Sequence, residues 1–538
     1  MKNKGLGNWV NRRRVKSSGD VAIISVEGTL RYEEFSDRVA RFANALADRG
    51  IGKGDRLVYL GNNHPDFLTT FFACATLGTI FVPLNTRLAP SELEYMLEDS
   101  GATVLVTHEG SRQLARAAAW SSGIAHRFVV GGPADLPAVE AFSEVIASAS
   151  GELSDVAVSL DDPAMILYTS GTTGRPKGAL LTHENLMWNV LNTIVDYDVT
   201  SEEVALLISP MFHVASLTMG ALPTFLKGGT IVLHDRFEPG AVLSAIEKYA
   251  VTSLSGVPTT FQMLAEHPAW SQTDLSSIRK LTCGGSAVPL RVIEHYERRG
   301  LSFSSGYGMT ETAPGATALP YRKAREHLGS SGLAHFFTDV RVVGPDGETL
   351  PAGETGEIEI SGPNVIREYW NRPDATAESH DGDWFRSGDI GHLDEEGYLT
   401  VSDRMKDMII SGGENIYPAE IEQIIMELPG IEAVAIIGVP DERWGEVPLA
   451  VVAQRPDARM RADAVLAHLD GRVAKYKVPR GVVYVDDLPR TATGKIQKGE
   501  LRSRFRELPS GSRPSSSAST PAMPTGWMPA IPTWDGSA

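Results

Sequence analysis

The sequence predicts an α/β fold with a large N-terminal domain of helix-covered parallel sheets, a β-rich subdomain, and a small α+β C-terminal domain. Helical and strand-like patterns alternate along the first third, short strands and glycine-rich turns begin near Val340, and the pattern changes again near Asp403. Repeated alternation of helix and strand favours parallel sheets covered by helices. Because 538 residues exceed what one hydrophobic core usually supports, we expect domains at 1–403 and 404–506 and a tail at 507–538.

The first helix and strand of this alternation are marked by side-chain spacing. Four large apolar residues recur at helical spacing and share one face: Phe35, Val39, Phe42 and Leu46. Gly50 is expected to end this helix. Residues 57–60 then form a short apolar run, which predicts a buried strand.

A second helix is expected after Pro90. Ser91 and Glu94 have the spacing of a capping box, in which each side chain satisfies a free N–H group at the helix start. Gly101 is expected to stop the helix before a strand at 103–107. The apolar positions of this helix are Leu93, Met96 and Leu97.

Residues 67–86 carry no charged side chain, and a stretch of about this length can span a bilayer. Threonines, Gly78 and Pro83 dilute its hydrophobicity. We therefore expect a buried helix that runs into a buried strand, and no stable membrane insertion.

The C-terminal part is predicted to be a separate α+β domain. Pro418 opens a helix, Pro429 and Gly430 end it, and residues 434–439 form the next strand. Its apolar positions lie on one side of the helix: Ile421, Ile424, Ile425 and Leu428. The tail after about Glu507 is rich in Ser, Pro and Ala and is expected to be disordered, with docking through Trp527 and Trp534 as the alternative.

The overall charge argues against nucleic acid as a partner. A formal net charge of −17 does not suit a surface that must neutralise phosphates with clustered cations, so a polyanionic substrate would be held by a local site.

Cys74 and Cys283 are the two cysteines, without a CxxC pair, and the basic N-terminal residues precede no apolar stretch. Together these features favour a cytoplasmic location. The sequence leaves a homodimer open.

The densest chemical signal lies at residues 168–178, directly after an apolar stretch. Glycines let the backbone approach an anion, hydroxyls donate to phosphate oxygens and a lysine supplies charge. The spacing is not that of a Walker A motif, because no Gly-Lys-Ser/Thr follows at the required distance. We predict a phosphate-binding loop whose nucleotide-binding residues are Thr169, Ser170, Gly171, Thr172, Thr173, Gly174 and Lys177.

This loop resembles the signature of the adenylate-forming enzymes, which include acyl-CoA synthetases, aryl-CoA ligases, firefly-type luciferases and the adenylation domains of peptide synthetases. The resemblance covers about residues 20–505, and the later motifs follow in the family's order. It implies ATP, Mg²⁺ and coenzyme A as cofactors or cosubstrates, and a C-terminal domain that moves.

Residues 305–312, Ser-Gly-Tyr-Gly-Met-Thr-Glu-Thr, resemble the family's adenine and magnesium motif. The resemblance implies that Tyr307 stacks on adenine, Thr310 contacts the α-phosphate and Glu311 is the metal ligand, roles that suit an aromatic face, a hydroxyl and a carboxylate. Residues 284–287 resemble the segment that lines the adenine and the acyl pocket. Further nucleotide-binding positions implied in this way are Gly285, Ser286, Ala287, Gly308 and Met309.

Three more polar residues have counterparts in the family. Asp389 and Arg404 match the pair that contacts the ribose, although the family more often has Thr where this chain has Ser387. Lys495, within residues 489–498, matches the catalytic lysine, whose ammonium would offset the repulsion between a carboxylate and a phosphate. Lys406 matches the hinge between the two domains.

The remaining matches concern the acyl group and its acceptor. Gly412 and Gly413 resemble a loop that leaves room for the pantetheine arm, and Trp444 and Lys477 are further candidates for binding coenzyme A. His213 corresponds to an aromatic gate beside the substrate carboxylate, and we expect it to bind substrate rather than act as a base. The other substrate-binding candidates are Gly284, Gly306 and Ala313.

These motifs predict an enzyme that converts a small-molecule carboxylic acid into an acyl adenylate with ATP and then forms a thioester with coenzyme A. Fatty, aromatic and bulky polycyclic acids stay open. The alternative is an acyl-AMP ligase that stops at the adenylate or passes it to a carrier protein or another enzyme. A non-catalytic nucleotide-binding or scaffold protein on the same fold is the rival class, and the intact Lys495, Glu311 and Asp389 argue against it.

Overall fold

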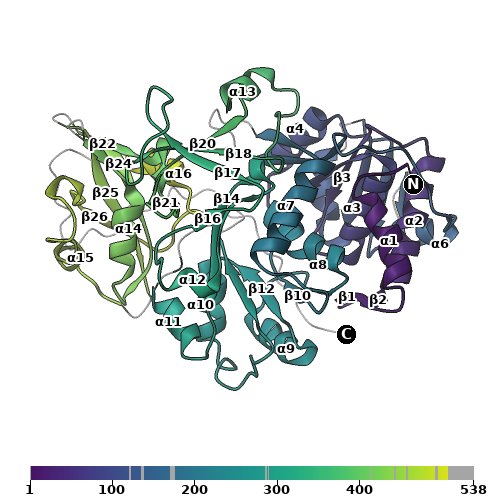
Figure 1. The fold of residues 1–538 in the computed structure, drawn as a ribbon, viewed down its shortest axis with the longest axis horizontal. Coiled ribbons are helices and arrows are strands. Elements are labelled where there is room, and N and C mark those ends of the chain that lie inside the picture. The colour runs from purple at the N-terminus through teal and green to yellow at the C-terminus, as the bar shows by residue number, and fades with distance from the viewer. Residues whose placement is uncertain are drawn as a thin grey trace, which may run out of the picture. The chain divides into compact units, whose positions relative to one another are not determined.

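The chain forms two compact units, each with its own hydrophobic core (Figure 1). The first unit comprises residues 1–406 and 490–495, and the second comprises residues 407–489 and the chain from 496 onward. The computed structural model describes residues 2–119, 123–134, 138–169, 176–284, 288, 290–411, 414–441, 444–455, 458–490 and 495–506, with the backbone alone at Arg404.

A seven-stranded sheet in the first unit carries the predicted phosphate-binding loop at one edge. Its strands pair in parallel except for the last two, which are antiparallel. In pairing order they are β7 (Val139–Ala141), β6 (His126–Val130), β5 (Val104–His108), β3 (Arg56–Leu60), β4 (Ile80–Leu84), β8 (Pro163–Thr169) and β9 (Lys177–Thr182).

A nine-stranded sheet forms the second half of the same unit. It is parallel at its centre, and β2, β15 and β16 pair antiparallel at its two edges. In pairing order its strands are β16 (Leu333–Ala334), β15 (Gly315–Leu319), β14 (Phe303–Gly308), β13 (Lys280–Cys283), β12 (Ser253–Gly256), β10 (Val204–Leu207), β11 (Thr230–Leu233), β1 (Val21–Ser25) and β2 (Gly28–Arg31).

Helices cover both faces of both sheets. Alternate residues of β3 enter two different cores, Leu57 and Tyr59 on one face and Val58 and Leu60 on the other. The core shared by the two sheets receives α1 (Gly7–Lys16), α2 (Tyr32–Asp48), α3 (Pro65–Leu77), α6 (Phe142–Ser148), α7 (His183–Asp196) and α8 (Leu222–Lys227). The outer faces are covered by α4 (Pro90–Ser100) and α5 (Arg112–Ala119) on one sheet and by α9 (Pro239–Tyr249), α10 (Pro258–Glu266) and α11 (Leu290–Glu297) on the other.

The spacing in the sequence predicted these early elements correctly. The face defined by Phe35, Val39 and Phe42 is buried in α2, and the uncharged stretch 67–86 forms the wholly buried α3 followed by the buried β4. Throughout the described residues, no helix combines the length and the hydropathy that crossing a membrane requires.

The predicted capping box at the start of α4 is wrong by two residues. The carboxylate of Glu92, not Glu94, accepts a hydrogen bond from the backbone N–H of Ala89, with an N···O distance of 2.8 Å. Pro90 occupies the first helical position, which its fixed φ and missing N–H group favour. The cap residue therefore precedes the proline, and Ser91 already lies inside the helix.

The β-rich subdomain and the C-terminal α+β domain are both present. The subdomain is an antiparallel sheet of β17 (Asp339–Val343), β18 (Gly356–Ser361), β19 (His380–Asp381), β20 (Trp384–Leu393) and β21 (Leu399–Arg404), with α12 (Tyr321–Ala324) before it and α13 (Pro373–Glu378) within it. The second unit contains β22 (Ile409–Ser411), β23 (Glu414–Ile416), β24 (Ile431–Asp441), β25 (Gly445–Gln454), β26 (Val482–Val485), α14 (Pro418–Met426), α15 (Ala462–His468) and α16 (Lys498–Phe505). The tail predicted at 507–538 lies outside the described residues.

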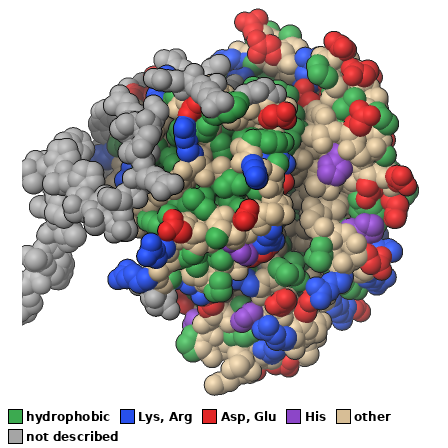
Figure 2. Space-filling view, turned by 90° about the vertical axis from the view of Figure 1, so that its left-hand side faces the viewer, with side chains coloured by type: hydrophobic (Ala, Val, Ile, Leu, Met, Phe, Trp, Pro, Cys, Tyr) green, Lys and Arg blue, Asp and Glu red, His purple; other side chains and the backbone are tan. Residues whose placement is uncertain are grey.

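Charged side chains of both signs share the surface. On the face drawn in Figure 2, lysine and arginine side chains are interspersed with acidic ones among the described residues. A mixed surface of this kind leaves the binding of a phosphorylated substrate to a local arrangement of donors.

Candidate active site

The phosphate-binding loop is held at both of its stems. β8 ends at Thr169 and β9 begins at Lys177, and these two residues are paired in the sheet. The hydroxyl of Tyr168 donates to Oδ2 of Asp99 at 2.8 Å, and the hydroxyl of Tyr95 donates to the carbonyl of Pro176 at 3.2 Å. Helix α4 therefore fixes the two ends of the loop, whose predicted phosphate-binding residues Ser170, Gly171, Thr172, Thr173 and Gly174 lie outside the described residues.

The motif at 305–312 forms a tight turn between β14 and β15. A 3₁₀ helix, η3 (Thr310–Thr312), follows β14 directly. Gly308 faces Gly315 in the antiparallel pair, and a Cβ atom on Gly308 would lie 1.7 Å from the carbonyl oxygen of Pro314. The N–H group of Met309 donates to the same carbonyl at 3.0 Å. Only glycine fits at position 308, and the turn places Thr310 and Glu311 at the end of β14.

Glu311 lies against the phosphate-binding loop. Its side chain is buried, and its Oε1 accepts hydrogen bonds from the hydroxyl of Tyr369 at 2.9 Å and from Oγ1 of Thr169 at 3.3 Å. The ammonium of Lys177 lies 5.5 Å from the centre of the Tyr369 ring. Burial, and secondly the Glu311 carboxylate, raise the pKa of Tyr369 far above its ordinary value, so this hydroxyl stays a donor.

Tyr369 is a site residue that the sequence motifs missed. It stands in an aromatic pair with Trp370, in the connection after β18 that also contains the buried Val365 and Ile366. Such a pair in a β-rich region is normally interpreted as core packing. The contact with Glu311 spans 58 residues of sequence, and no local pattern could have revealed it.

One of the two predicted ribose contacts, Asp389, meets the predicted adenine contact, Tyr307. The hydroxyl of Tyr307 donates to Oδ2 of Asp389 at 2.7 Å. Asp389 lies buried in β20, where its N–H group donates to Oγ of Ser387 at 3.0 Å. The strand register places Arg404 opposite Asp389, and the Arg404 side chain lies outside the described part of the chain. An aromatic ring and a carboxylate are thus brought together as a nucleoside requires.

The substrate-binding candidates differ in their surroundings. A Cβ atom on Gly284 would meet no atom of the described residues within 4 Å, whereas one on Gly306 would lie 2.5 Å from the carbonyl oxygen of Thr317. Ala313 is wholly buried, and its carbonyl accepts a hydrogen bond from Thr218 at 2.7 Å. Gly285, Ser286 and Ala287 lie outside the described residues. Among the described residues, Gly284 is therefore the one of these three positions with free space beside it.

His213 and His183 are neutral at physiological pH. Burial, and secondly the Arg87 charge, lower the pKa of His213 to about 4. Burial also lowers the pKa of His183 to about 4, against the opposing influence of Asp162. In both rings Nε2 has no hydrogen-bond partner within the described residues. A neutral imidazole at position 213 suits binding rather than charge stabilisation.

These two histidines predict that stability falls as the pH drops from about 6.5 to about 4. In that range the unfolded chain, with the ordinary histidine pKa near 6.5, binds protons that the folded chain does not, so the free energy of unfolding decreases. For the wholly buried His183 the loss is roughly 3 kcal/mol once the pH is below both values. Thermal unfolding near pH 7 and near pH 5 measures this, and His183→Gln should flatten the pH dependence. An unchanged slope in that variant would contradict the assignment.

The candidates for binding coenzyme A lie in the second unit. Trp444 is 44% exposed, and its backbone N–H group donates to Oδ1 of Asp441 at 3.0 Å. The ammonium of Lys477 donates to Oε2 of Glu420 at 2.7 Å. Ser411 and Glu414 are paired across a hairpin whose turn, Gly412 and Gly413, lies outside the described residues.

The two predicted functional lysines lie at the limits of the first unit. Lys406 lies in a 3₁₀ helix, η4 (Met405–Asp407), and the boundary between the units falls directly after it. Lys495 is exposed and belongs to the segment 490–495 that groups with the first unit. The same unit therefore contains the phosphate-binding loop, Glu311, Asp389 and Lys495.

Comparisons with known proteins agree on one family. The family described as AMP-binding enzyme matches residues 11–370, and its C-terminal domain matches residues 420–495. A feruloyl-CoA synthase of an Amycolatopsis species is 51% identical over 506 residues, which cover 94% of this chain and 100% of that protein. An indoleacetate–CoA ligase of Aromatoleum aromaticum is 42% identical, with 92% of this chain and 97% of that protein covered.

A solved structure agrees with them over nearly the whole chain. The crystal structure of ATP-bound MatB from Rhodopseudomonas palustris superposes with a TM-score of 0.85 at 34% sequence identity, and covers 93% of this chain and 99% of that one. The likeness extends over both the AMP-binding domain and its C-terminal domain.

Proposed function

The chain belongs to the AMP-binding enzyme family and is an acid–thiol ligase, and from this premise we propose that it makes an acyl-CoA in two steps at one cleft. In the first step a carboxylate oxygen attacks the α-phosphorus of ATP, and the bond to the leaving pyrophosphate breaks. In the second step the sulfur of coenzyme A attacks the acyl carbon and AMP leaves. The observation that carries the proposal is the convergence of the loop stems, Glu311 and the Tyr307–Asp389 pair in one unit.

The nucleoside would be held by the partly buried Tyr307 of β14 together with the buried Asp389 of β20. In this proposal the ring of Tyr307 stacks on adenine while its hydroxyl stays fixed by Asp389. A carboxylate with two acceptor oxygens suits the two hydroxyls of a ribose. Thr310, at the start of the 3₁₀ helix, would donate to the α-phosphate beside the phosphate-binding loop.

Glu311 fits a magnesium ion. Its carboxylate is buried, and within the described residues hydrogen bonds reach only its Oε1. No cluster of three or more His, Cys, Asp or Glu side chains that could hold a metal occurs in the described chain, so phosphate oxygens and water would complete the coordination, as is usual for Mg²⁺. When bound, the ion would neutralise charge on the phosphate oxygens.

Lys495 would act in the first step, and Lys406 would be the hinge for the change to the second step. We assign the ammonium of Lys495 to the first step, where it stabilises the charge that develops between the carboxylate and the α-phosphate. The grouping of 490–495 with the first unit supports this role. The boundary after Lys406 supports a hinge there, about which the C-terminal domain would withdraw Lys495 and bring in the loop at Gly412 and Gly413 for coenzyme A.

An aromatic acid is the substrate that we propose. Identity of 51% over the full length of a feruloyl-CoA synthase supports this class. The two buried cysteine thiols, Cys74 and Cys283, support a cytoplasmic location.

Product analysis with a panel of acids tests the proposal. Ferulate, indoleacetate and a long-chain fatty acid are each supplied with ATP, Mg²⁺ and coenzyme A, and pyrophosphate and acyl-CoA are measured. We expect kcat/KM to be highest for ferulate, with one acyl-CoA formed per pyrophosphate. Pyrophosphate without acyl-CoA would point to an enzyme that stops at the adenylate, and a preference for the fatty acid would overturn the proposed acid class.

A further inference from the structure

One connecting segment contacts both the stem of the phosphate-binding loop and the turn that carries Glu311. Residues 364–370, which lie between β18 and α13, run beside β9, where the backbone N–H group of Trp370 donates to the carbonyl of Gly178 at 2.7 Å. Nearer its start, the N–H group of Ile366 donates to the backbone carbonyl of Glu311 at 2.9 Å. The segment is thus tied at one end to the stem of the phosphate-binding loop and at the other to the turn with Glu311.

Asn364 closes this turn from behind. Its side chain is wholly buried, and its Nδ2 donates to the carbonyls of Thr312 at 2.8 Å and Gly315 at 2.7 Å. Its Oδ1 accepts from the hydroxyl of Thr338 at 2.7 Å. One amide side chain therefore bridges both ends of the four-residue turn that follows Glu311.

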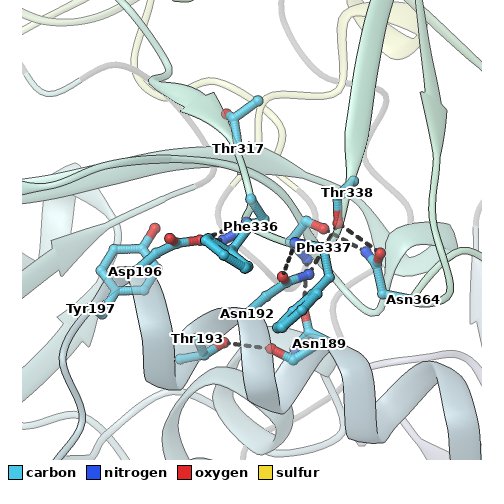
Figure 3. Close-up of polar contacts among 12 residues, drawn as sticks. Asn189, Asn192, Thr193, Asp196, Tyr197, Thr317, Phe336, Phe337, Thr338 and Asn364 are labelled. Atoms are coloured by element: carbon cyan, nitrogen blue, oxygen red, sulfur yellow. Dashed lines mark hydrogen bonds and ion pairs between the residues drawn. The ribbon is translucent and has the colours of Figure 1, made fainter.

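The amide network continues into helix α7 (Figure 3). Asn192 donates from Nδ2 to the hydroxyl of Thr338 at 3.0 Å, and Asn189 accepts from the N–H group of Gly315 at 2.9 Å. Figure 3 shows these asparagines on one side of α7, facing the segment that carries Phe337 and Thr338. Satisfied buried amide networks restrict a backbone to one arrangement, so the turn at 310–315 is supported from α7 and from Asn364 together.

Tyr369, in the same segment as Asn364, contacts the side chain of Glu311. Its hydroxyl donates to Oε1 of Glu311, the same oxygen that accepts from Thr169. Oε2 receives no hydrogen bond from the described residues. With one oxygen anchored by two donors, rotation of the carboxylate is restricted, and Oε2 is the oxygen left to coordinate a cation. The contact of Lys177 with the same ring joins the second charged group of the site to this tyrosine.

We propose that Tyr369 is a positioning residue for the metal, which anchors Oε1 of Glu311 so that Oε2 is aimed at Mg²⁺ bound to the nucleotide. This inference rests on the proposed role of Glu311 as the metal ligand. The segment 364–370 would then contribute to the binding of the metal. If the segment were purely structural, a substitution in it would change stability and leave the metal affinity unchanged.

The test is the substitution Tyr369→Phe, which removes the hydroxyl and keeps the ring. A lost hydrogen bond to a charged group corresponds to roughly a ten-fold change in an equilibrium constant. We therefore expect the Mg²⁺ concentration for half-maximal adenylation to rise about ten-fold, while kcat at saturating Mg²⁺ and KM for the acid stay close to those of the unsubstituted enzyme. The second readout is binding of Mn²⁺ in the presence of a non-hydrolysable ATP analogue, followed by electron paramagnetic resonance, which should weaken by a similar factor.

Tyr32→Phe is the matched control. Tyr32 is also buried, and its hydroxyl donates to the carbonyl of Gly229 at 2.7 Å, in a different part of the unit. It should lose stability without any change in the Mg²⁺ requirement or in Mn²⁺ binding. An equal change in both variants, or none in Tyr369→Phe, would overturn the proposal. If Tyr369→Phe does not fold, Thr169→Val removes the other donor to the same oxygen and should shift the metal requirement in the same direction.

A third variant separates this inference from the proposed function. Glu311→Gln should lose most metal-dependent adenylation whether or not Tyr369 matters. If Glu311→Gln retains the normal Mg²⁺ requirement, the metal-binding role of Glu311 itself is wrong. If Glu311→Gln behaves as expected and Tyr369→Phe does not, only the positioning role is wrong.

Discussion

Lys495→Ala is expected to abolish acyl-adenylate formation and to leave thioester formation from a supplied acyl adenylate close to normal. In the first step two anions meet, and an ammonium between the carboxylate and the α-phosphate offsets their repulsion. Removing one such stabilising group typically lowers a rate about 10²- to 10³-fold. In the second step the nucleophile attacks a carbonyl after pyrophosphate has left, so the ammonium has no comparable task. Pyrophosphate release and acyl-CoA formation from synthetic acyl-AMP measure the two steps separately.

The control for this variant is another lysine of the same unit. Lys323→Ala removes an exposed ammonium that pairs with Glu326 at 2.8 Å and that belongs to none of the motifs of the site. It should leave both steps unchanged. Lys406→Pro should produce the opposite pattern from Lys495→Ala, because proline fixes φ and restricts the preceding residue at the proposed hinge. Equal decreases in the rates of both steps in Lys495→Ala would contradict the assignment of Lys495 to the first step alone.

Local patterns in the sequence were sufficient for much of the fold. The face of α2 follows from helical spacing, since burial requires apolar residues about every third or fourth position. The buried pair α3 and β4 follows from an uncharged stretch interrupted by Gly78, which adopts the left-handed conformation that ends the helix. The start of α4 was misplaced because the favoured first position of Pro90 outweighed the spacing of Ser91 and Glu94.

The candidate site was predictable where one short segment carries several functional groups. The loop stems and the motif with Tyr307 and Glu311 are of this kind. Contacts between segments distant in sequence were not predictable, because no spacing encodes them. Asp99 accepts hydrogen bonds from Tyr168, 69 residues away, and from Arg372, 273 residues away.

The long-range contacts have a common physical consequence. Each motif places a charged or polar group, and a residue from another segment then fixes that group's direction, as Tyr369 does for Glu311. A catalytic site needs its donors and ligands held within a fraction of an ångström, and side chains with two anchors reach this more readily than side chains with one. Residues outside the motifs are therefore where metal affinity and substrate positioning can differ among enzymes that share every motif.

Gly308→Ala is expected to eliminate adenylation and to destabilise the first unit. The added methyl group would lie 1.7 Å from the carbonyl oxygen of Pro314 and 3.1 Å from the backbone nitrogen of Ala316. Both atoms belong to the backbone, so β14 and β15 would have to separate, and the hydrogen bond from Met309 to Pro314 would be lost with them. The turn with Thr310 and Glu311 would move away from the phosphate-binding loop. Overpacking of this kind typically costs about 1–3 kcal/mol.

The effect on activity should exceed the effect on stability, and this difference is the informative result. A folded Gly308→Ala protein should bind ATP weakly and release no pyrophosphate, because displacement of Glu311 separates it from Tyr369 and Thr169. Gly52→Ala is the matched control, since its Cβ would meet no atom of the described chain within 4 Å, and it should keep full activity. Normal pyrophosphate release by Gly308→Ala at unchanged thermal stability would mean that the turn tolerates a wider separation of β14 and β15, and that its close packing does not position Glu311.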